Sequence, residues 1–329
     1  MKYHFCNSFS WESGQDVSSR FGPQQTGGTI IQHVRPVDLQ ASVALSAGIL
    51  SRWSTILADN SDTADTPGLV GPAGDFNLEA AWWRTVAGEF AEKTRTMWRD
   101  SWFRDYDSRA REWSSQQDAM HLAPVFCGVV GQDHLEQLRP FLTKPPKHSS
   151  GWAPFSWPPV VMTLVGAADV AQMPLDAAEL AYRFIDASYR STDSRELDEH
   201  GGLPGVTREY RSGVTAGKWG EIDYVNAGIE GYGWGALSVF LLIRYVMGLR
   251  EEEPGVITVA PMLPHTLRRY GASYKIAPVQ WGKYVLNIEC IVRDAGSFAM
   301  RLSSTDGEDQ PRQWEWTGKW GDARRIQLA

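Results

Sequence analysis

The stretch from Asp38 to Ala58 reads DLQASVALSAGILSRWSTILA, and apolar residues recur in it at steps of three and four. The residues that follow this spacing are Leu39, Val43, Ala47, Leu50, Trp53 and Leu57. A spacing of three and four places these side chains on one face of an α-helix. The sequence therefore predicts a long helix over about residues 38–58.

Further helices are predicted on both sides of long polar loops. A second long helix begins near Asn77, the expected cap, and has an apolar stripe of Leu78, Trp82, Val86, Phe90 and Met97. Shorter helices are expected over 117–130, 135–143, 157–170 and 176–189, and a strong final one over about 228–249. The intervening loops, 59–76, 104–116, 143–156 and 191–226, are long enough to suggest a functional role.

The pattern changes after Pro254. Residues 255–261, 270–276, 283–293 and 298–303 alternate in polarity or are β-branched, as strands do, and a short strand is also expected over 29–34. Helices followed by strands, without β-α-β alternation, indicate a mainly α fold. We expect helical hairpins stacked around an axis over residues 1–254 and a small β-rich appendage over residues 255–329.

Composition excludes several classes of protein. The 329 residues are 43% hydrophobic and 22% charged, which is typical of a folded domain. A net charge of −7 argues against a nucleic-acid surface, which needs clustered Lys and Arg. The three cysteines, Cys6, Cys127 and Cys290, and the seven histidines show no ligand spacing, so neither a metal site nor a disulfide framework is expected.

Nothing in the sequence predicts insertion into a membrane. Residues 1–21 contain no apolar segment of the kind found in signal peptides, and the most apolar stretch, 236–249, is too short for a bilayer. We therefore expect no membrane partner. If the N-terminus is the authentic one, the expected location is cytoplasmic; otherwise the compartment stays open.

Two groups of carboxylates lie among aromatic residues and glycines. The first is the segment from Trp11 to Phe21, WESGQDVSSRF, and the second runs from Arg208 to Trp234. By spacing alone, Asp16 is more readily a turn residue or a helix cap, and the glutamates of the second group suit an exposed loop. The residues by themselves do not decide between these roles and catalysis.

The motifs and their order resemble trehalases and the glycoside hydrolase family 63, which includes mannosylglycerate hydrolase-like enzymes. The first segment is similar to the family's E-S-G-x-D-x-S-x-R motif, and residues 102–107, WFRDYD, resemble a helix end that leads into a D-Y-D turn. Residues 151–157, GWAPFSW, resemble the family's G-W-A-P-x-x-W motif. Residues 209–234 resemble the stretch that holds the catalytic base, and residues 259–264, VAPMLP, resemble the exit from the barrel. The similarity is colinear over roughly residues 10–265.

The resemblance implies an inverting α-glycosidase without a cofactor, acting on an α-glucoside or α-mannoside. Its general acid falls on Asp16 and its general base on Glu209, with Glu221 as the second choice. The residues that it suggests for substrate binding are Trp11, Glu12, Gln15, Arg20, Trp152, Trp157, Glu221 and Trp234. Each of these is at least as readily structural, and the fifteen tryptophans are mostly expected in the core.

The sequence departs from the family in one respect. Relatives close a ring of twelve helices with the acid segment near the middle, whereas here that segment lies at residues 11–21. About half of the toroid is therefore expected to be absent, to be completed by an N-terminal half or by another chain. Two alternatives stay open: a non-catalytic carbohydrate-binding or truncated inactive protein, and an enzyme of another helical-toroid family with its carboxylates elsewhere.

Overall fold

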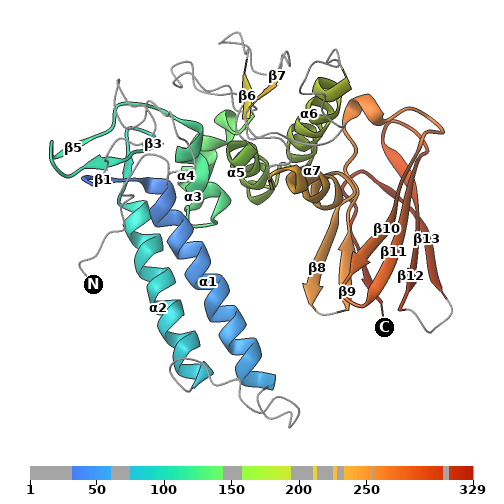
Figure 1. The fold of residues 1–329 in the computed structure, drawn as a ribbon, viewed down its shortest axis with the longest axis horizontal. Coiled ribbons are helices and arrows are strands. Elements are labelled where there is room, and N and C mark those ends of the chain that lie inside the picture. The colour runs from blue at the N-terminus through green and yellow to red at the C-terminus, as the bar shows by residue number, and fades with distance from the viewer. Residues whose placement is uncertain are drawn as a thin grey trace. The chain divides into compact units, whose positions relative to one another are not determined.

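The computed structural model describes residues 32–60, 75–143, 158–193, 210–212, 225–227, 233–253, 255–306 and 311–328. These residues form two compact units, one from residues up to 172 and the other from residues 173 onward. The described residues combine seven α-helices with several small antiparallel sheets (Figure 1). The fold is thus mixed, with more β structure than the sequence pattern predicts, and the half-toroid arrangement remains a prediction.

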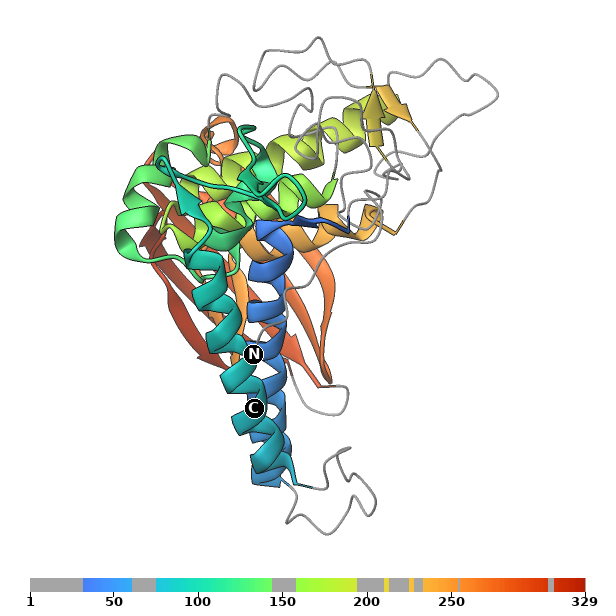
Figure 2. The same cartoon turned by 90° about the vertical axis from the view of Figure 1, so that its left-hand side faces the viewer.

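A hairpin of two long helices dominates the first unit. Helix α1 (Val37–Asn60) and helix α2 (Phe76–Arg95) lie side by side along most of their length, as both views show (Figures 1 and 2). They pack closely because α1 presents small residues to α2, and the Ser51 hydroxyl donates to the Ala80 carbonyl at 2.8 Å. A buried cluster joins the hairpin to the rest of the unit: Ala41, Ala44, Ala47, Val86, Phe90, Cys127 and Val129.

The two long helices are confirmed, but details of both are corrected. The buried face of α1 holds Ala41, Ala44, Ala47 and Ser51, whereas Trp53 and Leu57 of the predicted stripe are exposed.

Helix α2 ends at Arg95, so Met97 of its predicted stripe lies beyond the helix. The N-cap is Asp75 rather than Asn77, and the Asp75 carboxylate accepts hydrogen bonds from the backbone N–H groups of Asn77 and Leu78. Leu78 and Trp82 are exposed rather than buried. The inner face at this end of α2 is formed by Ala80, whose carbonyl bonds α1, so the two large side chains point elsewhere.

The rest of the first unit consists of short elements. They are β1 (Val34–Arg35), β2 (Trp98–Arg99), β3 (Trp102–Phe103), β4 (Tyr106–Asp107), β5 (Glu112–Trp113), the 3₁₀-helices η3 (Ala119–Leu122) and η4 (Arg139–Phe141), and helices α3 (Ala123–Phe126), α4 (Gln132–Leu138) and α5 (Pro158–Val170). Helices α3 and α5 approach closely at Gly166, where an added Cβ would lie 2.2 Å from the Phe126 ring. Only glycine fits this contact.

By length and composition, one described helical segment is long and apolar enough to cross a membrane. It is Val37–Asp59 in α1, whose most apolar 18 residues have a mean hydropathy of 1.2 and are 28% buried.

The second unit begins with helix α6 (Pro174–Asp193), the short strands β6 (Tyr210–Ser212) and β7 (Val225–Ala227), and helix α7 (Gly235–Leu241). Helix α7 continues into one π-helical turn, η5 (Leu242–Val246). The chain then leaves the helix at Gly248, which has φ +71° and whose Cβ, if present, would lie 1.9 Å from the Ala260 carbonyl oxygen. A left-handed glycine thus ends the final helix that the sequence predicts to run to residue 249.

The C-terminal part of the second unit consists mainly of two antiparallel sheets and the 3₁₀-helix η6 (His265–Leu267). One sheet has the order β14-β9-β8, from β8 (Leu249–Glu253), β9 (Val256–Val259) and β14 (Arg324–Gln327). The other has the order β10-β11-β12-β13, from β10 (Ser273–Trp281), β11 (Tyr284–Val292), β12 (Ser297–Thr305) and β13 (Arg312–Lys319).

Three of these strands, β8, β13 and β14, were not expected from the sequence. All three lie at sheet edges. Strands β8 and β14 are rich in charged residues, which protect an exposed edge but hide the alternation of a strand, whereas β13 does alternate, with Trp314 and Trp316 between polar residues. The division into regions 1–254 and 255–329 remains a prediction, and β8 pairs with β9 across it.

Candidate functional site

Most of the residues predicted for catalysis and substrate binding lie outside the described residues. They are Trp11, Glu12, Gln15, Asp16, Arg20, Trp152, Trp157, Glu209 and Glu221. Their roles therefore remain predictions.

Part of the segment that is expected to hold the catalytic base, residues 209–234, is described by the structure. Strand β6 begins at Tyr210, directly after Glu209, and pairs antiparallel with β7, so that Tyr210 is opposite Ala227. Trp234, the described member of the predicted site, is the N-cap residue of α7 and is partly exposed. Its carbonyl accepts from the Leu237 N–H at 3.0 Å, so its backbone starts the helix.

The segment Trp102–Asp107, which resembles a D-Y-D turn, forms a buried polar network. The Asp105 carboxylate accepts from the Val37 N–H at 2.8 Å through Oδ1, and its Oδ2 lies 3.1 Å from His121 Nε2. His121 Nδ1 accepts from the Trp102 indole N–H at 3.1 Å and from the Asp118 N–H at 3.3 Å. Because Nδ1 accepts, Nε2 carries the proton and donates to Asp105. This network anchors the first turn of α1.

The second aspartate of the same motif organises a turn between strands. The Asp107 carboxylate accepts from the N–H groups of Arg109 and Ala110, at 2.8 and 2.9 Å, and closes the β4–β5 connection. Next to it, the Tyr106 and Trp113 rings lie 4.9 Å apart on paired strands. Both motif aspartates thus have structural partners in the first unit.

The described cysteines are not poised as nucleophiles. Burial raises the pKa of the Cys127 thiol and of the Cys290 thiol to about 12. Since the thiolate is the reactive form, both side chains act as small apolar core residues. Among the described residues, no group of three His, Cys, Asp or Glu side chains is placed to hold a metal ion.

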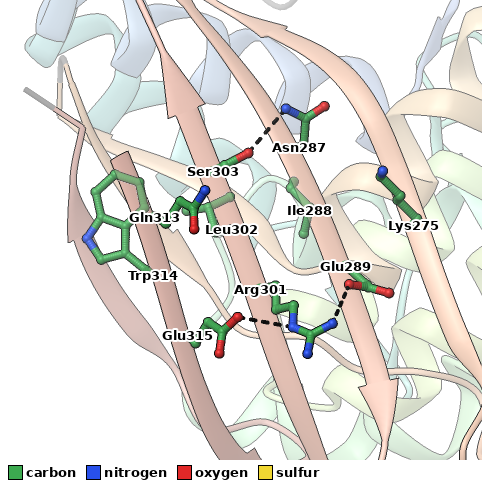
Figure 3. Close-up of a pocket in the computed structure, with 10 residues that line it drawn as sticks. All are labelled: Lys275, Asn287, Ile288, Glu289, Arg301, Leu302, Ser303, Gln313, Trp314 and Glu315. Carbon is green, nitrogen blue, oxygen red and sulfur yellow. Dashed lines mark hydrogen bonds and ion pairs between the residues drawn. The ribbon is translucent and has the colours of Figure 1, made fainter. Parts of the chain in front are cut away.

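A polar hollow lies on the outer face of the four-stranded sheet in the second unit (Figure 3). Its volume is about 200 Å³, and its lining residues are Lys275, Asn287, Ile288, Glu289, Arg301, Leu302, Ser303, Gln313, Trp314 and Glu315. Strand β11 alternates strictly, so that Leu286, Ile288 and Cys290 are buried while Asn287 and Glu289 face outward.

The register of the sheet arranges the outward side chains in two rows. One row crosses all four strands and alternates in charge: Lys275, Glu289, Arg301 and Glu315. Arg301 joins its neighbours, with Nη1 3.3 Å from Glu289 and Nε 3.1 Å from Glu315. The next row is uncharged and consists of Asn287, Ser303 and Gln313.

The carboxylate in the middle of the charged row is held in its ionised form. The Ser273 hydroxyl donates to Glu289 at 2.7 Å and, together with Arg301, lowers the pKa of this carboxyl. None of the residues in these two rows was predicted from the sequence to belong to a site. The alternation in residues 283–293 shows which side chains face outward, but only the register shows which of them lie side by side.

Comparison with known proteins gives matches to solved structures alone: no protein-family profile and no curated protein matches the chain. The chain is similar to neutral trehalase Nth1 from Saccharomyces cerevisiae, with 18% identity, a TM-score of 0.45, and coverage of 70% of this chain and 40% of that one. It is also similar to the GH63 mannosylglycerate hydrolase from Thermus thermophilus.

In its complex with Tris that hydrolase gives 16% identity and a TM-score of 0.41, with 64% of this chain and 45% of the other covered. In its complex with glucose the TM-score is 0.42, at the same identity, with 64% and 48% covered. The chain thus spans less than half the length of each of these structures.

Proposed function

We propose that this chain carries the catalytic part of an inverting α-glycoside hydrolase, with Asp16 as general acid and Glu209 as general base. The observation that carries the proposal is the colinear order of the sequence motifs over roughly residues 10–265. The backbone around the base segment supports it, because Glu209 directly precedes the paired strand β6 and Trp234 starts α7.

The proposed chemistry needs two carboxyl groups with different protonation states. Hydrolysis of an acetal with inversion uses a carboxylic acid that protonates the departing oxygen and a carboxylate that activates water on the opposite face of the sugar. The two groups stand roughly 6.5–9.5 Å apart in such enzymes, which leaves room for the water. Asp16 must stay protonated, and an aromatic wall formed by Trp11 and Phe21 is the proposed cause, while Glu209 must stay ionised.

The stereochemistry of the product tests the mechanism. The full chain is incubated with a panel of α-glucosides and α-mannosides, and proton NMR follows the anomers during the first minutes. Inversion releases the β-anomer first. Initial release of the α-anomer would contradict the mechanism, and binding without turnover would select the non-catalytic alternative.

The two roles are separated by substitution. Asp16→Asn and Glu209→Gln should each lower kcat by roughly 10²–10⁴-fold on a natural disaccharide. On a glycosyl fluoride, whose leaving group needs no proton, Asp16→Asn should recover most of the rate while Glu209→Gln should not. Glu221→Gln is the matched control for the base: a larger loss there than in Glu209→Gln would move the base to Glu221.

A further inference from the structure

The hollow on the outer face of β10–β13 combines features that suit one class of ligand, and we propose that it is a non-catalytic binding site for a neutral carbohydrate. The inference goes beyond the proposed hydrolysis and does not depend on it, because none of the lining residues belongs to the predicted catalytic segments.

The charges that line the hollow are balanced. The charged row holds two cations, Lys275 and Arg301, and two anions, Glu289 and Glu315, at alternating positions across the strands. Arg301 is already joined to both glutamates. The hollow therefore offers no net charge to attract a phosphate, a carboxylate or a free cation, and a neutral polar ligand fits it better.

The uncharged row of the hollow offers hydrogen-bonding groups of the kind that bind sugars. A sugar hydroxyl both donates and accepts, and the row of Asn287, Ser303 and Gln313 supplies amides and a hydroxyl that do the same. Asn287 Nδ2 donates to Ser303 Oγ at 3.2 Å, which orients the Asn287 carbonyl oxygen as an acceptor. Of the guanidinium nitrogens of Arg301, Nη2 has no partner among the described residues and remains a donor for a ligand.

The hollow is lined by side chains held on paired strands, and its volume is small. Asn287 and Ser303 are held by the bond between them, and Glu289 by Ser273 and Arg301, on strands whose pairing is continuous (Figure 3). Little side-chain entropy of these groups is therefore lost when a ligand binds. Ile288, Leu302 and Trp314 lie between the two rows along their strands, and the side chains of Ile288 and Leu302 are buried on the opposite face, so the sheet itself forms the floor. A volume of about 200 Å³ is below the ~300–1,000 Å³ of common small-molecule pockets. The hollow thus suits a single sugar ring.

Calorimetric titration of the full chain tests the site. The Asp16→Asn/Glu209→Gln protein serves as background, so that no turnover occurs, and the probes are methyl α-glucoside, methyl α-mannoside and trehalose. We expect millimolar binding of at least one probe. Arg301→Ala and the pair Asn287→Ala/Gln313→Ala should each weaken it at least about tenfold, the ratio that corresponds to the loss of a hydrogen bond to a charged group.

Thr317→Ala is the matched control, since Thr317 faces outward on β13 but does not line the hollow. It should bind as the background does, and circular dichroism should show all variants folded. In protein with ¹⁵N-labelled Asn and Gln, the probe should shift the side-chain amide signals that Asn287→Ala and Gln313→Ala remove. A shift there identifies binding at this face rather than near Glu209.

Three results would overturn the proposal. The first is unchanged affinity in the Arg301 and Asn287/Gln313 variants. The second is no binding of any neutral probe up to about 50 mM, which is well above the expected millimolar range. The third is glucuronate binding more than tenfold tighter than methyl α-glucoside. None of them bears on hydrolysis, which is judged by Asp16 and Glu209 alone.

Discussion

Each of the two units contains a network of polar side chains, and the two networks differ mainly in how far their side chains are buried. In the first unit His121 and Asp105 expose 0% and 1% of their side chains. In the second, Glu289, Arg301 and Glu315 expose 29%, 54% and 69%. The lengths of the bonds are alike, at 3.1 Å for the buried pair and 3.1–3.3 Å for the open row.

The burial of a polar cluster, more than the lengths of its bonds, thus decides whether the cluster stabilises the fold or is available for recognition. A buried donor or acceptor that loses its partner cannot turn to water, so the first network is needed for stability. An exposed ion pair is worth only about 0–1 kcal/mol, because water solvates the separated charges nearly as well. The open row is therefore free to serve recognition, whereas the buried network positions α1.

The largest effect is expected for the thiols that lie in the two cores. A Cys6→Ser protein keeps only Cys127 and Cys290, whose pKa values burial raises from 9.0 to about 12. That shift lowers the thiolate population near neutral pH by about a thousandfold, and burial also blocks access. We expect no reaction with a chromogenic disulfide reagent in the native protein and two equivalents after unfolding.

Adding Cys127→Ser or Cys290→Ser then assigns any slow reaction to one unit. The labelling rate in each case reports how often that unit opens. Labelling of either thiol within seconds in the native protein would show that its core is not closed as described.

The next largest effect is expected for the buried network. His121→Ala removes the acceptor of the buried Trp102 indole N–H and one hydrogen bond of the Asp105 carboxylate, and should lower the free energy of unfolding by about 3 kcal/mol. Urea unfolding followed by circular dichroism measures the change. The matched control is His265→Ala, an exposed histidine in the second unit, which should change stability by less than about 0.5 kcal/mol. Equal effects of the two substitutions would remove the contrast between the units.

The smallest effect concerns the open row and its dependence on pH. The pKa of Glu289 is lowered in the folded protein, first by the Ser273 hydroxyl and further by Arg301. A lowered folded pKa means that the ionised carboxylate stabilises the fold above its unfolded pKa, and that this contribution is lost as the pH falls through the folded value.

Glu289→Gln should therefore flatten the fall in stability on the acid side while changing stability at pH 7 by less than about 1 kcal/mol. Ser273→Ala should shift the acid midpoint toward higher pH, because the carboxylate loses its main hydrogen bond. Unfolding curves between pH 2 and 7, a span of about five units around carboxyl titration, measure both. An unchanged midpoint in Ser273→Ala would contradict the assigned cause.

The periodicity of the sequence predicts much of the fold, because helices and inner strands leave a local signal. The stripe in residues 38–58 gives α1, and residues 283–293 give β11. The edge strand β14, RRIQ, leaves little such signal, because an edge strand tolerates charge on its residues. The alternation of Trp314 and Trp316 with polar residues in β13 is a signal that could have found that strand. The exposed positions of Leu78 and Trp82 were missed because apolar spacing marks a face without saying what covers it.

The same limit applies to the sites. The sequence alone supplied the motifs that nominate Asp16 and Glu209, together with the residue types of the sheet face, because identity and local spacing are written in the chain. Tertiary structure alone decided that His121 meets Asp105 and that Glu289 stands between Lys275 and Arg301. Such neighbours depend on helix packing and strand register, which are set by long-range contacts throughout the fold rather than by the residues themselves.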